Sequence, residues 1–255
     1  MGDNTKPKVT VVLATYNERE NLQRLIPEIF QFAADAEILV IDDNSPDGTG
    51  DLADSLAEDD SRIHVLHREG KLGLGTATLA GFRYGIDHDY DLLINLDADF
   101  SHHPQYIPAL RACMEQADVA IGSRYVEGGG VEGWGFHRHV MSRSINWYAR
   151  LLLGLKTRDN SGSYRCYRVA KLRELDLDRV RARGYAFQEE ILYRCRRIDC
   201  RFLETPIVFE DRRYGESKIS SKESVIALWV IFRLGIENLL KVPVTVERER
   251  QRESR

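Results

Sequence analysis

The sequence predicts an α/β fold with a mostly parallel central sheet and helices on both faces. Two observations in the first half of this 255-residue chain predict it. Short apolar runs bounded by turn-forming residues, such as Val9–Leu13 and Glu37–Ile41, are typical of buried strands. Longer segments with helical spacing separate these runs, and a strand that alternates with a helix indicates a parallel sheet covered on both sides.

The predicted elements alternate regularly up to residue 121. Strands are expected at residues 9–13, 37–41, 63–66, 91–96 and 119–121, and helices at 18–33, 50–58, 75–88 and 103–116. The glycine-rich residues 127–130 are expected to form a flexible loop. After this loop the expected elements are a helix at 138–153, a strand at 163–169, a helix at 186–197, a strand at 201–209 and an amphipathic helix at 221–241.

The boundary near residues 125–136 separates two halves of one folded unit. No internal repeat or low-complexity linker divides the chain, so residues 1–246 are expected to form a single domain with halves 1–125 and 126–246. Residues 247–255 are almost all charged, and we expect them to be a disordered tail.

The two parts of the chain differ in charge although the formal net charge is only −4. Residues 1–137 carry 10 Lys/Arg and 24 Asp/Glu, whereas residues 138–218 carry 19 and 11. This asymmetry suggests two ligand chemistries, one for each part.

Several classes of protein are excluded at this stage. Residues 1–8 are short and polar, so no secretory signal is expected, and no stretch approaches the roughly 20 apolar residues that span a bilayer. The four cysteines lack paired C-x-x-C spacing, which favours free thiols over a zinc site or a disulfide framework.

Acidic residues follow three of the predicted strands. Glu18 follows the first strand, Asp42 and Asp43 the second, and Asp97 and Asp99 the fourth. The carboxyl ends of parallel strands meet at one edge of a sheet, where ligands bind. Because these carboxylates repel one another, a cation or hydrogen-bond donors are expected there, and Asp97-x-Asp99 is suited to Mg²⁺ or Mn²⁺ that bridges phosphates.

Each motif also has a purely structural interpretation. Asp99 or Ser101 can cap the following helix, and Asp42-Asp43 can form an Asx turn. The first strand is not followed by G-x-G-x-x-G, which argues against a Rossmann dinucleotide site. The glycine-rich residues 71–76 are not a Walker A loop and are expected to form a tight turn between strand and helix.

The second part of the chain supplies cations. Arg124, Arg138, Arg212 and Lys218 follow predicted strands or begin predicted helices, and arginine binds phosphate oxygens in a bidentate manner. A nucleic acid is not expected as a partner, because the acidic sheet edge would repel a polyanion and no motif that reads RNA or DNA occurs.

Eight sequence strings together carry a resemblance to the dolichyl-phosphate (polyprenyl-phosphate) mannosyltransferases. The acidic strings alone fit any inverting glycosyltransferase of family two. The longer strings of the second half narrow the resemblance to the polyprenyl-phosphate mannosyltransferases. The strings occupy residues 13–22, 41–49, 71–76, 97–104, 122–125, 133–142, 184–190 and 211–218.

The resemblance implies an A-type glycosyltransferase (nucleotide-diphospho-sugar transferase) fold that moves mannose from GDP-mannose to a polyprenyl phosphate with inversion. The first half would hold the nucleotide and the metal, and the second half the acceptor. By motif, guanosine would lie against Ala14, Tyr16, Glu18, Ile41 and Asp43, and the diphosphate and its Mg²⁺ or Mn²⁺ would lie against Asp97, Ala98 and Asp99, with Asp97 and Asp99 as metal ligands.

The resemblance also implies that Arg124, Arg212 and Lys218 contact phosphate, and that Arg138 and Ser142 face the acceptor phosphate, which makes Asp99, Arg124 and Arg138 the candidate catalytic residues. Ala14 stands where the family usually has proline. Ser101 stands where some members have a glutamine as third metal ligand.

A lipid acceptor implies a cytoplasmic protein that associates peripherally with the cytoplasmic face of a membrane, alone or through a separate anchor subunit. The apolar segments 225–240 and 147–153 can lie in the membrane interface or pack on the sheet. Two alternatives remain open: a related transferase that uses another sugar nucleotide, for example a polyprenyl-phosphate glucosyltransferase, and a non-catalytic nucleotide-binding subunit.

Overall fold

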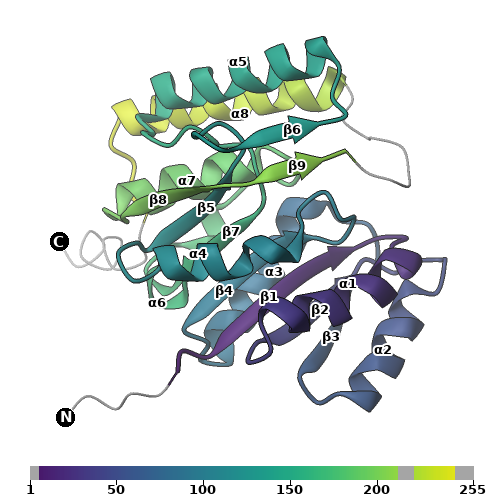
Figure 1. The fold of residues 1–255 in the computed structure, drawn as a ribbon. Helices are drawn as coiled ribbons and strands as arrows, with labels where there is room; N and C mark the ends of the chain where they lie inside the picture. Colours follow the sequence, from purple (N-terminus) through teal and green to yellow (C-terminus); the bar gives the residue numbers. More distant parts are fainter. Residues whose placement is uncertain (1–5, 212–220, 245–255) are drawn as a thin grey trace.

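The structure, a computed structural model, describes residues 6–211 and 221–244. A seven-stranded sheet of order β3-β2-β1-β4-β7-β5-β8 forms its centre (Figure 1). All neighbouring strands in it are parallel except β7, which is antiparallel to both β4 and β5, so the predicted mostly parallel sheet is confirmed. The strands are β1 (Val9–Thr15), β2 (Glu37–Asp42), β3 (Ile63–His67), β4 (Leu92–Asp97), β5 (Val119–Ser123), β7 (Arg165–Arg168) and β8 (Phe202–Pro206).

A short helix, α6 (Val169–Arg173), was not expected and begins at the last residue of the strand predicted at 163–169. The other α-helices agree with the expected pattern except between residues 103 and 116. There the chain forms a 3₁₀ turn (Pro104–Tyr106) and a short helix that ends at Cys113, because Pro104 and Pro108 lack the N–H groups of a continuous helix. The α-helices are α1 (Arg19–Phe32), α2 (Thr49–Asp59), α3 (Leu74–Asp87), α4 (Ile107–Cys113), α5 (Phe136–Leu153), α6 (Val169–Arg173), α7 (Phe187–Arg197) and α8 (Ser221–Leu239), and a second 3₁₀ turn is Leu177–Arg179.

The single strand expected at 201–209 was wrong. The chain there forms two strands: β8 pairs with β5, and β9 (Val208–Glu210) pairs with β6 (Gly130–Glu132) in a separate two-stranded sheet. Pro206 has no N–H to continue the ladder, and Ile207 turns into the core, where it is 1% exposed. The region expected to be a loop at 127–130 leads directly into β6, and the backbone carbonyl of Glu132 at its end accepts a hydrogen bond from the N–H of Asp211.

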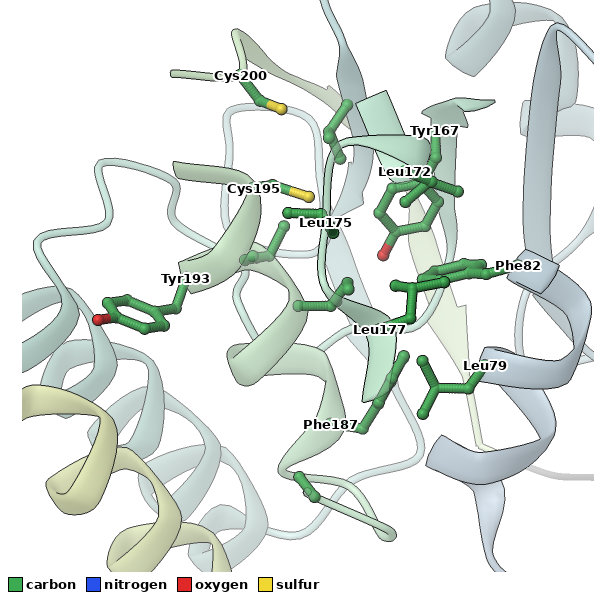
Figure 2. Packing of buried hydrophobic residues seen from close by; sticks show 14 of the residues in the cluster. Leu79, Phe82, Tyr167, Leu172, Leu175, Leu177, Phe187, Tyr193, Cys195 and Cys200 are labelled. Atoms are coloured by element: carbon green, nitrogen blue, oxygen red, sulfur yellow. The ribbon is translucent and has the colours of Figure 1, made fainter. Parts of the chain in front are cut away.

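Two hydrophobic cores lie on opposite faces of the sheet. Val11 and Leu13 of β1 pack with α1, α2 and α4, whereas Val12 between them packs with α3, α5, α7 and α8. Figure 2 shows the second core, in which the ring of Phe82 lies 5.0 Å from that of Tyr167 and 6.0 Å from that of Phe187. Since strands buried on both faces need apolar side chains at every position, this explains the uninterrupted apolar runs of the sequence.

Helices α5 and α8 lie side by side across the top of Figure 1 and close one side of the second core. Gly235 makes this close approach possible, because a Cβ atom added there would lie 3.3 Å from Cβ of Leu152. Ile231 and Leu234 of α8 are fully buried, so this helix packs on the body of the protein. Within the described part of the chain, none of the helices has the length and apolarity needed to cross a bilayer.

The glycine-rich residues 71–76 form the predicted turn into α3. Gly73 has φ +102°, in the region that favours glycine, and a Cβ on Gly75 would lie 2.7 Å from the carbonyl oxygen of Ala182. All four cysteines are unpaired, as expected, and Figure 2 shows Cys195 and Cys200 inside the second core.

Candidate active site

Three loops meet at the carboxyl edge of the sheet, after β1, β2 and β4. Each contains a non-glycine residue with positive φ: Asn17 at 61°, Asn44 at 57° and Phe100 at 62°. Asparagine tolerates this conformation, whereas a bulky side chain such as that of Phe100 adopts it at a cost of order 1 kcal/mol. Such backbone strain clusters at functional sites, and here it marks the edge that the acidic motifs indicate.

The two aspartates after β2 have different roles. Asp42 closes the loop locally, because its Oδ2 accepts a hydrogen bond of 2.9 Å from the backbone N–H of Ser45, three residues on and thus one residue further than in an Asx turn. Asp43 instead lies 3.2 Å from the guanidinium of Arg68 and accepts a hydrogen bond from the N–H of Leu72. Burial raises the pKa of Asp43 above its ordinary value even though Arg68 opposes this shift.

The other residues predicted to contact guanosine lie around the same loops. The ring of Tyr16 is 4.3 Å from Nζ of Lys71, and Glu18 accepts a hydrogen bond from the side chain of Asn21. Ala14 is partly buried at the end of β1. The side chain of Ile41 is fully buried in the second core, so only its backbone can reach a ligand.

Asp97 ends β4 at the mouth of the site. Its Oδ1 accepts a hydrogen bond of 2.8 Å from the hydroxyl of Ser163, and its Oδ2 lies 3.4 Å from Nδ1 of His102. Burial of His102 lowers its pKa, although the charges of Asp97 and Asp99 oppose this shift. The ring is therefore neutral near pH 7.

Asp99 is 7% exposed, and its Oδ1 accepts a hydrogen bond of 3.0 Å from the N–H of Ser101. The cap of the following 3₁₀ turn is His103, so neither Asp99 nor Ser101 is the helix cap. Ala98 between the two aspartates packs in the first core, at 3% exposure.

The carboxylates of Asp97 and Asp99 are a donor set that suits a hard divalent cation. Magnesium and manganese prefer carboxylate oxygens and keep positions for substrate oxygens and water. Among the described residues, no group of three or more His, Cys, Asp or Glu side chains could hold a metal by itself. An ion held by these two aspartates would need its remaining ligands from outside this set of side chains.

Arg124, at the end of β5, forms a buried ion pair with Asp159. Nε and Nη2 of the arginine donate to the two carboxylate oxygens over 2.7 and 2.6 Å, and the backbone N–H of Arg124 donates over 3.0 Å. Burial raises the pKa of Asp159, but the charge of Arg124 and these hydrogen bonds outweigh it and hold the pKa below its ordinary value. A phosphate that reaches Arg124 thus has to share it with Asp159.

Arg138 and Ser142 lie one turn apart on α5. Nη1 of Arg138 donates to both carboxylate oxygens of Asp211 over 2.9 and 3.0 Å, and its guanidinium stacks 4.2 Å from the ring of Trp134. The hydroxyl of Ser142 accepts a hydrogen bond of 2.7 Å from Tyr125.

A cavity of about 120 Å³ joins the acidic sheet edge to α5. It brings together Asp97, Arg124, Arg138 and Ser142, although these residues come from three separate parts of the sequence. The predicted guanosine contacts do not line this cavity and lie along the neighbouring loops. Arg212, Lys218 and the tail 247–255 lie outside the described residues.

Sequence reasoning missed several residues at this site. Asp159, the partner of Arg124, lies 35 positions further along the chain, and Glu189 and Gln188 line the cavity from the first turn of α7. The string 184–190 pointed to α7 without a role for these two side chains. The available signal was the position of Gln188 and Glu189 between apolar residues, in the first turn of the helix predicted at 186–197.

Comparison with known proteins assigns this site to a family. The sequence model of the family described as glycosyl transferase family 2 matches residues 10–176. This range runs from β1 to beyond β7 and contains the Asp97–Asp99 motif. The chain belongs to glycosyltransferase family 2. It is therefore a glycosyltransferase, as the motifs predicted.

Two relatives within this family align with most of the chain. The undecaprenyl-phosphate mannosyltransferase of Micrococcus luteus is 43% identical over 213 residues, which cover 84% of this chain and 88% of that protein. The polyprenol monophosphomannose synthase of Mycolicibacterium smegmatis is 42% identical over 235 residues, which cover 91% and 89%. The predicted resemblance to the polyprenyl-phosphate mannosyltransferases is thereby confirmed.

Solved structures of glycosyltransferases share the fold. Glucosyl-3-phosphoglycerate synthase from Mycobacterium tuberculosis, in complex with Mn²⁺, UDP and glucosyl-3-phosphoglycerate, aligns with a TM-score of 0.64 at 17% identity and covers 93% of this chain and 81% of its own. A mannosyltransferase from Pyrobaculum calidifontis in complex with GDP-Man and Mn²⁺ aligns with a TM-score of 0.57 at 14% identity, covering 95% and 66%. The family 2 protein described here thus has the predicted A-type glycosyltransferase fold.

Proposed function

We propose that this glycosyltransferase transfers mannose from GDP-mannose to a polyprenyl phosphate, giving polyprenyl-phosphate mannose and GDP. The observation that carries the proposal is the cavity that joins Asp97, at the donor edge, to Arg138 and Ser142 on α5. The names of the two relatives, both 42–43% identical over most of the chain, support mannose as the sugar and a polyprenyl phosphate as the acceptor.

In this proposal the nucleotide lies along the loops after β1 and β2. Asp43, buried beside Arg68, would accept hydrogen bonds from the base or the ribose, and Tyr16 and Glu18 would flank it with Ala14 and the backbone of Ile41. The diphosphate would lie at Asp97, Ala98 and Asp99. Arg212 and Lys218 remain predicted phosphate contacts on motif grounds.

Asp97 and Asp99 would hold Mg²⁺ or Mn²⁺ together with the diphosphate. The bound ion would neutralise charge on the departing GDP. Two solved structures with this fold were obtained in complex with Mn²⁺, which supports a divalent metal as the cofactor.

The acceptor phosphate needs positioning more than deprotonation. A phosphate monoester has a second pKa of about 6, so it is largely dianionic near neutral pH. Arg138 and Ser142 would hold it in line with the anomeric carbon, and the attack of a phosphate oxygen there breaks the bond to GDP with inversion. No side-chain base is required in this scheme.

Helices α5 and α8 carry the surface that we assign to the membrane. Both present large apolar side chains to solvent next to the cavity, as an amphipathic interfacial helix does. These are Phe136, Val140, Met141, Trp147 and Leu151 of α5 and Val225, Ile226, Leu228, Trp229, Phe232, Ile236 and Leu239 of α8. The opposite face of α8 packs on the second core, so this helix contributes both to the core and to the exposed apolar surface. The protein would associate peripherally with the cytoplasmic face of a membrane through this surface, with or without an anchor subunit.

We expect the protein to sediment with anionic liposomes at low salt and to dissociate as the salt concentration rises, because basic side chains of α5 would contact the lipid headgroups. Trp147 and Trp229 are each 64% exposed, so replacing both by serine leaves the fold intact. The loss of two such contacts lowers the liposome partition coefficient at least about tenfold. Phe32→Ser on α1 is the control; unchanged sedimentation of the Trp147→Ser/Trp229→Ser variant would contradict the assignment.

A transfer assay tests the proposed reaction. The purified protein is incubated with a short polyprenyl phosphate and with GDP-mannose, GDP-glucose, UDP-glucose or UDP-N-acetylglucosamine, with Mn²⁺ or with a chelator. We expect a glycolipid from GDP-mannose only, and none with the chelator. A product from another donor would assign a different sugar, and no product from any donor would favour a non-catalytic nucleotide-binding protein.

A further inference from the structure

Besides those of His102 and Arg138, which each lie against a carboxylate, three buried polar atoms of cavity-lining side chains have no hydrogen-bond partner among the described residues. They are Oε2 of Glu189, Nε2 of Gln188 and Nε1 of Trp134, and all three side chains line the cavity beside Arg124 and Arg138. Glu189 and Gln188 are each only 2% exposed. Because a buried polar atom without a partner is destabilising, such atoms are retained where a ligand satisfies them.

The neighbouring residue Glu190 shows that the fold can satisfy a buried carboxylate at this turn of α7. Its Oε2 accepts hydrogen bonds from the backbone N–H groups of Arg181 and Ala182, and its Oε1 accepts from Arg194. Glu189 differs because its side chain lines the cavity and no described residue donates a hydrogen bond to its Oε2. The contrast between adjacent glutamates indicates a ligand at Glu189.

We propose that Glu189, Gln188 and Trp134 bind the hexose of the donor and thereby set its identity. The inference rests on the proposed function, since it places a sugar nucleotide in this cavity. A hexose carries several hydroxyl groups, each of which can donate and accept a hydrogen bond. Its hydroxyls would donate to Glu189 and accept from the side-chain N–H groups of Gln188 and Trp134, which matches all three atoms.

The charge of the cavity also favours a sugar over a phosphate at this position. A carboxylate repels a phosphate, so the anionic groups of donor and acceptor belong near Arg138 and the metal edge, away from Glu189. Burial raises the pKa of Glu189 to about 7. Both of its forms bond a hydroxyl, the ionised form as acceptor and the protonated form also as donor.

Binding measurements on Glu189→Gln test the inference. Dissociation constants are measured by calorimetry with Mn²⁺ for two pairs of ligands, GDP with GDP-mannose and UDP with UDP-glucose. We expect the variant to bind its sugar nucleotide at least tenfold more weakly than the wild type does, and to bind the matching nucleoside diphosphate with less than a twofold change. Gln188→Leu, which keeps the backbone carbonyl bonded to Arg165, is expected to act in the same direction.

Glu190→Gln is the matched control in the same helical turn. It removes a structural carboxylate, so we expect it to lower the melting temperature and to change the dissociation constants of the nucleoside diphosphate and of its sugar nucleotide by the same factor. Equal effects of Glu189→Gln on diphosphate and sugar nucleotide, or no effect on either, would overturn the inference. If the wild type binds the UDP pair and not the GDP pair, the proposed mannose donor fails, and the same comparison within the UDP pair still tests Glu189.

Discussion

Replacing Asp99 by alanine is expected to abolish mannose transfer. A bound divalent metal contributes several kcal/mol of stabilisation to the charge that develops on the departing diphosphate. Because about 1.4 kcal/mol corresponds to a tenfold change in rate, turnover should fall by about 10³-fold or more. Steady-state transfer to a short polyprenyl phosphate measures the rate, and the paramagnetic resonance of Mn²⁺ with GDP measures metal binding independently.

Two further variants separate the metal from the local fold. Asp99→Asn keeps the shape of the side chain and an oxygen that can accept from the N–H of Ser101, so it should fold normally and still lose most of the activity. Asp59→Ala removes an exposed carboxylate at the far end of α2 and should leave the rate unchanged. Near-normal turnover of Asp99→Ala, or of the wild type with the metal chelated, would exclude the metal-assisted mechanism.

The second large effect concerns stability. Asp159→Asn is expected to lower the free energy of unfolding by about 3–5 kcal/mol, because it leaves the buried guanidinium of Arg124 without a counter-charge. Urea denaturation measures the change. The comparable substitution at the surface is Asp35→Asn, which breaks a bidentate pair with Arg111. The side chain of Asp35 is 37% exposed and that of Arg111 is 22% exposed, so this substitution should lower the free energy of unfolding by less than about 1 kcal/mol.

The pH dependence of this effect has a defined sign. The pKa of Asp159 is lowered in the folded protein, so its stabilising contribution is present above the ordinary aspartate pKa of about 4 and is lost as the pH falls through the lowered value. The difference between wild type and Asp159→Asn should therefore shrink at strongly acidic pH. Replacement of both partners, in Arg124→Met/Asp159→Asn, should restore much of the lost stability, because asparagine keeps an oxygen for the backbone N–H groups that Asp159 bonds. Equal costs at Asp159 and Asp35 would contradict the assignment of a buried pair.

The sequence predicted well what depends on local pattern. The apolar runs at β1, β2 and β4 located the strands, and the acidic residues after them located the edge of the site. The partners of a strand were not predictable in this way, because nothing within residues 163–169 indicates that β7 lies antiparallel between β4 and β5. Pro206 was a usable signal for the division of the strand expected at 201–209, since proline cannot donate to the ladder.

The residues of the candidate site were likewise predicted only in part. Asp97, Asp99 and Arg138 were predicted because each belongs to a short contiguous string that resembles a motif of the family. The pairing of Arg124 with Asp159 and the burial of Glu189 depend on contacts between distant segments, and such contacts leave no trace in the spacing of residues. For that reason the sequence indicated a phosphate contact at Arg124 and missed the carboxylate that neutralises it.

The two hydrophobic cores lie on opposite faces of the sheet and are covered by different helices. Helices α5 and α8 rest on the core that contains Val12, whereas α1 and α2 rest on the core that contains Val11 and Leu13. Substitutions that share no contacts add in their effects on stability. Substitutions on the exposed faces of α5 and α8 are therefore expected to leave the packing of α1 and α2, beside the loops after β1 and β2, unchanged.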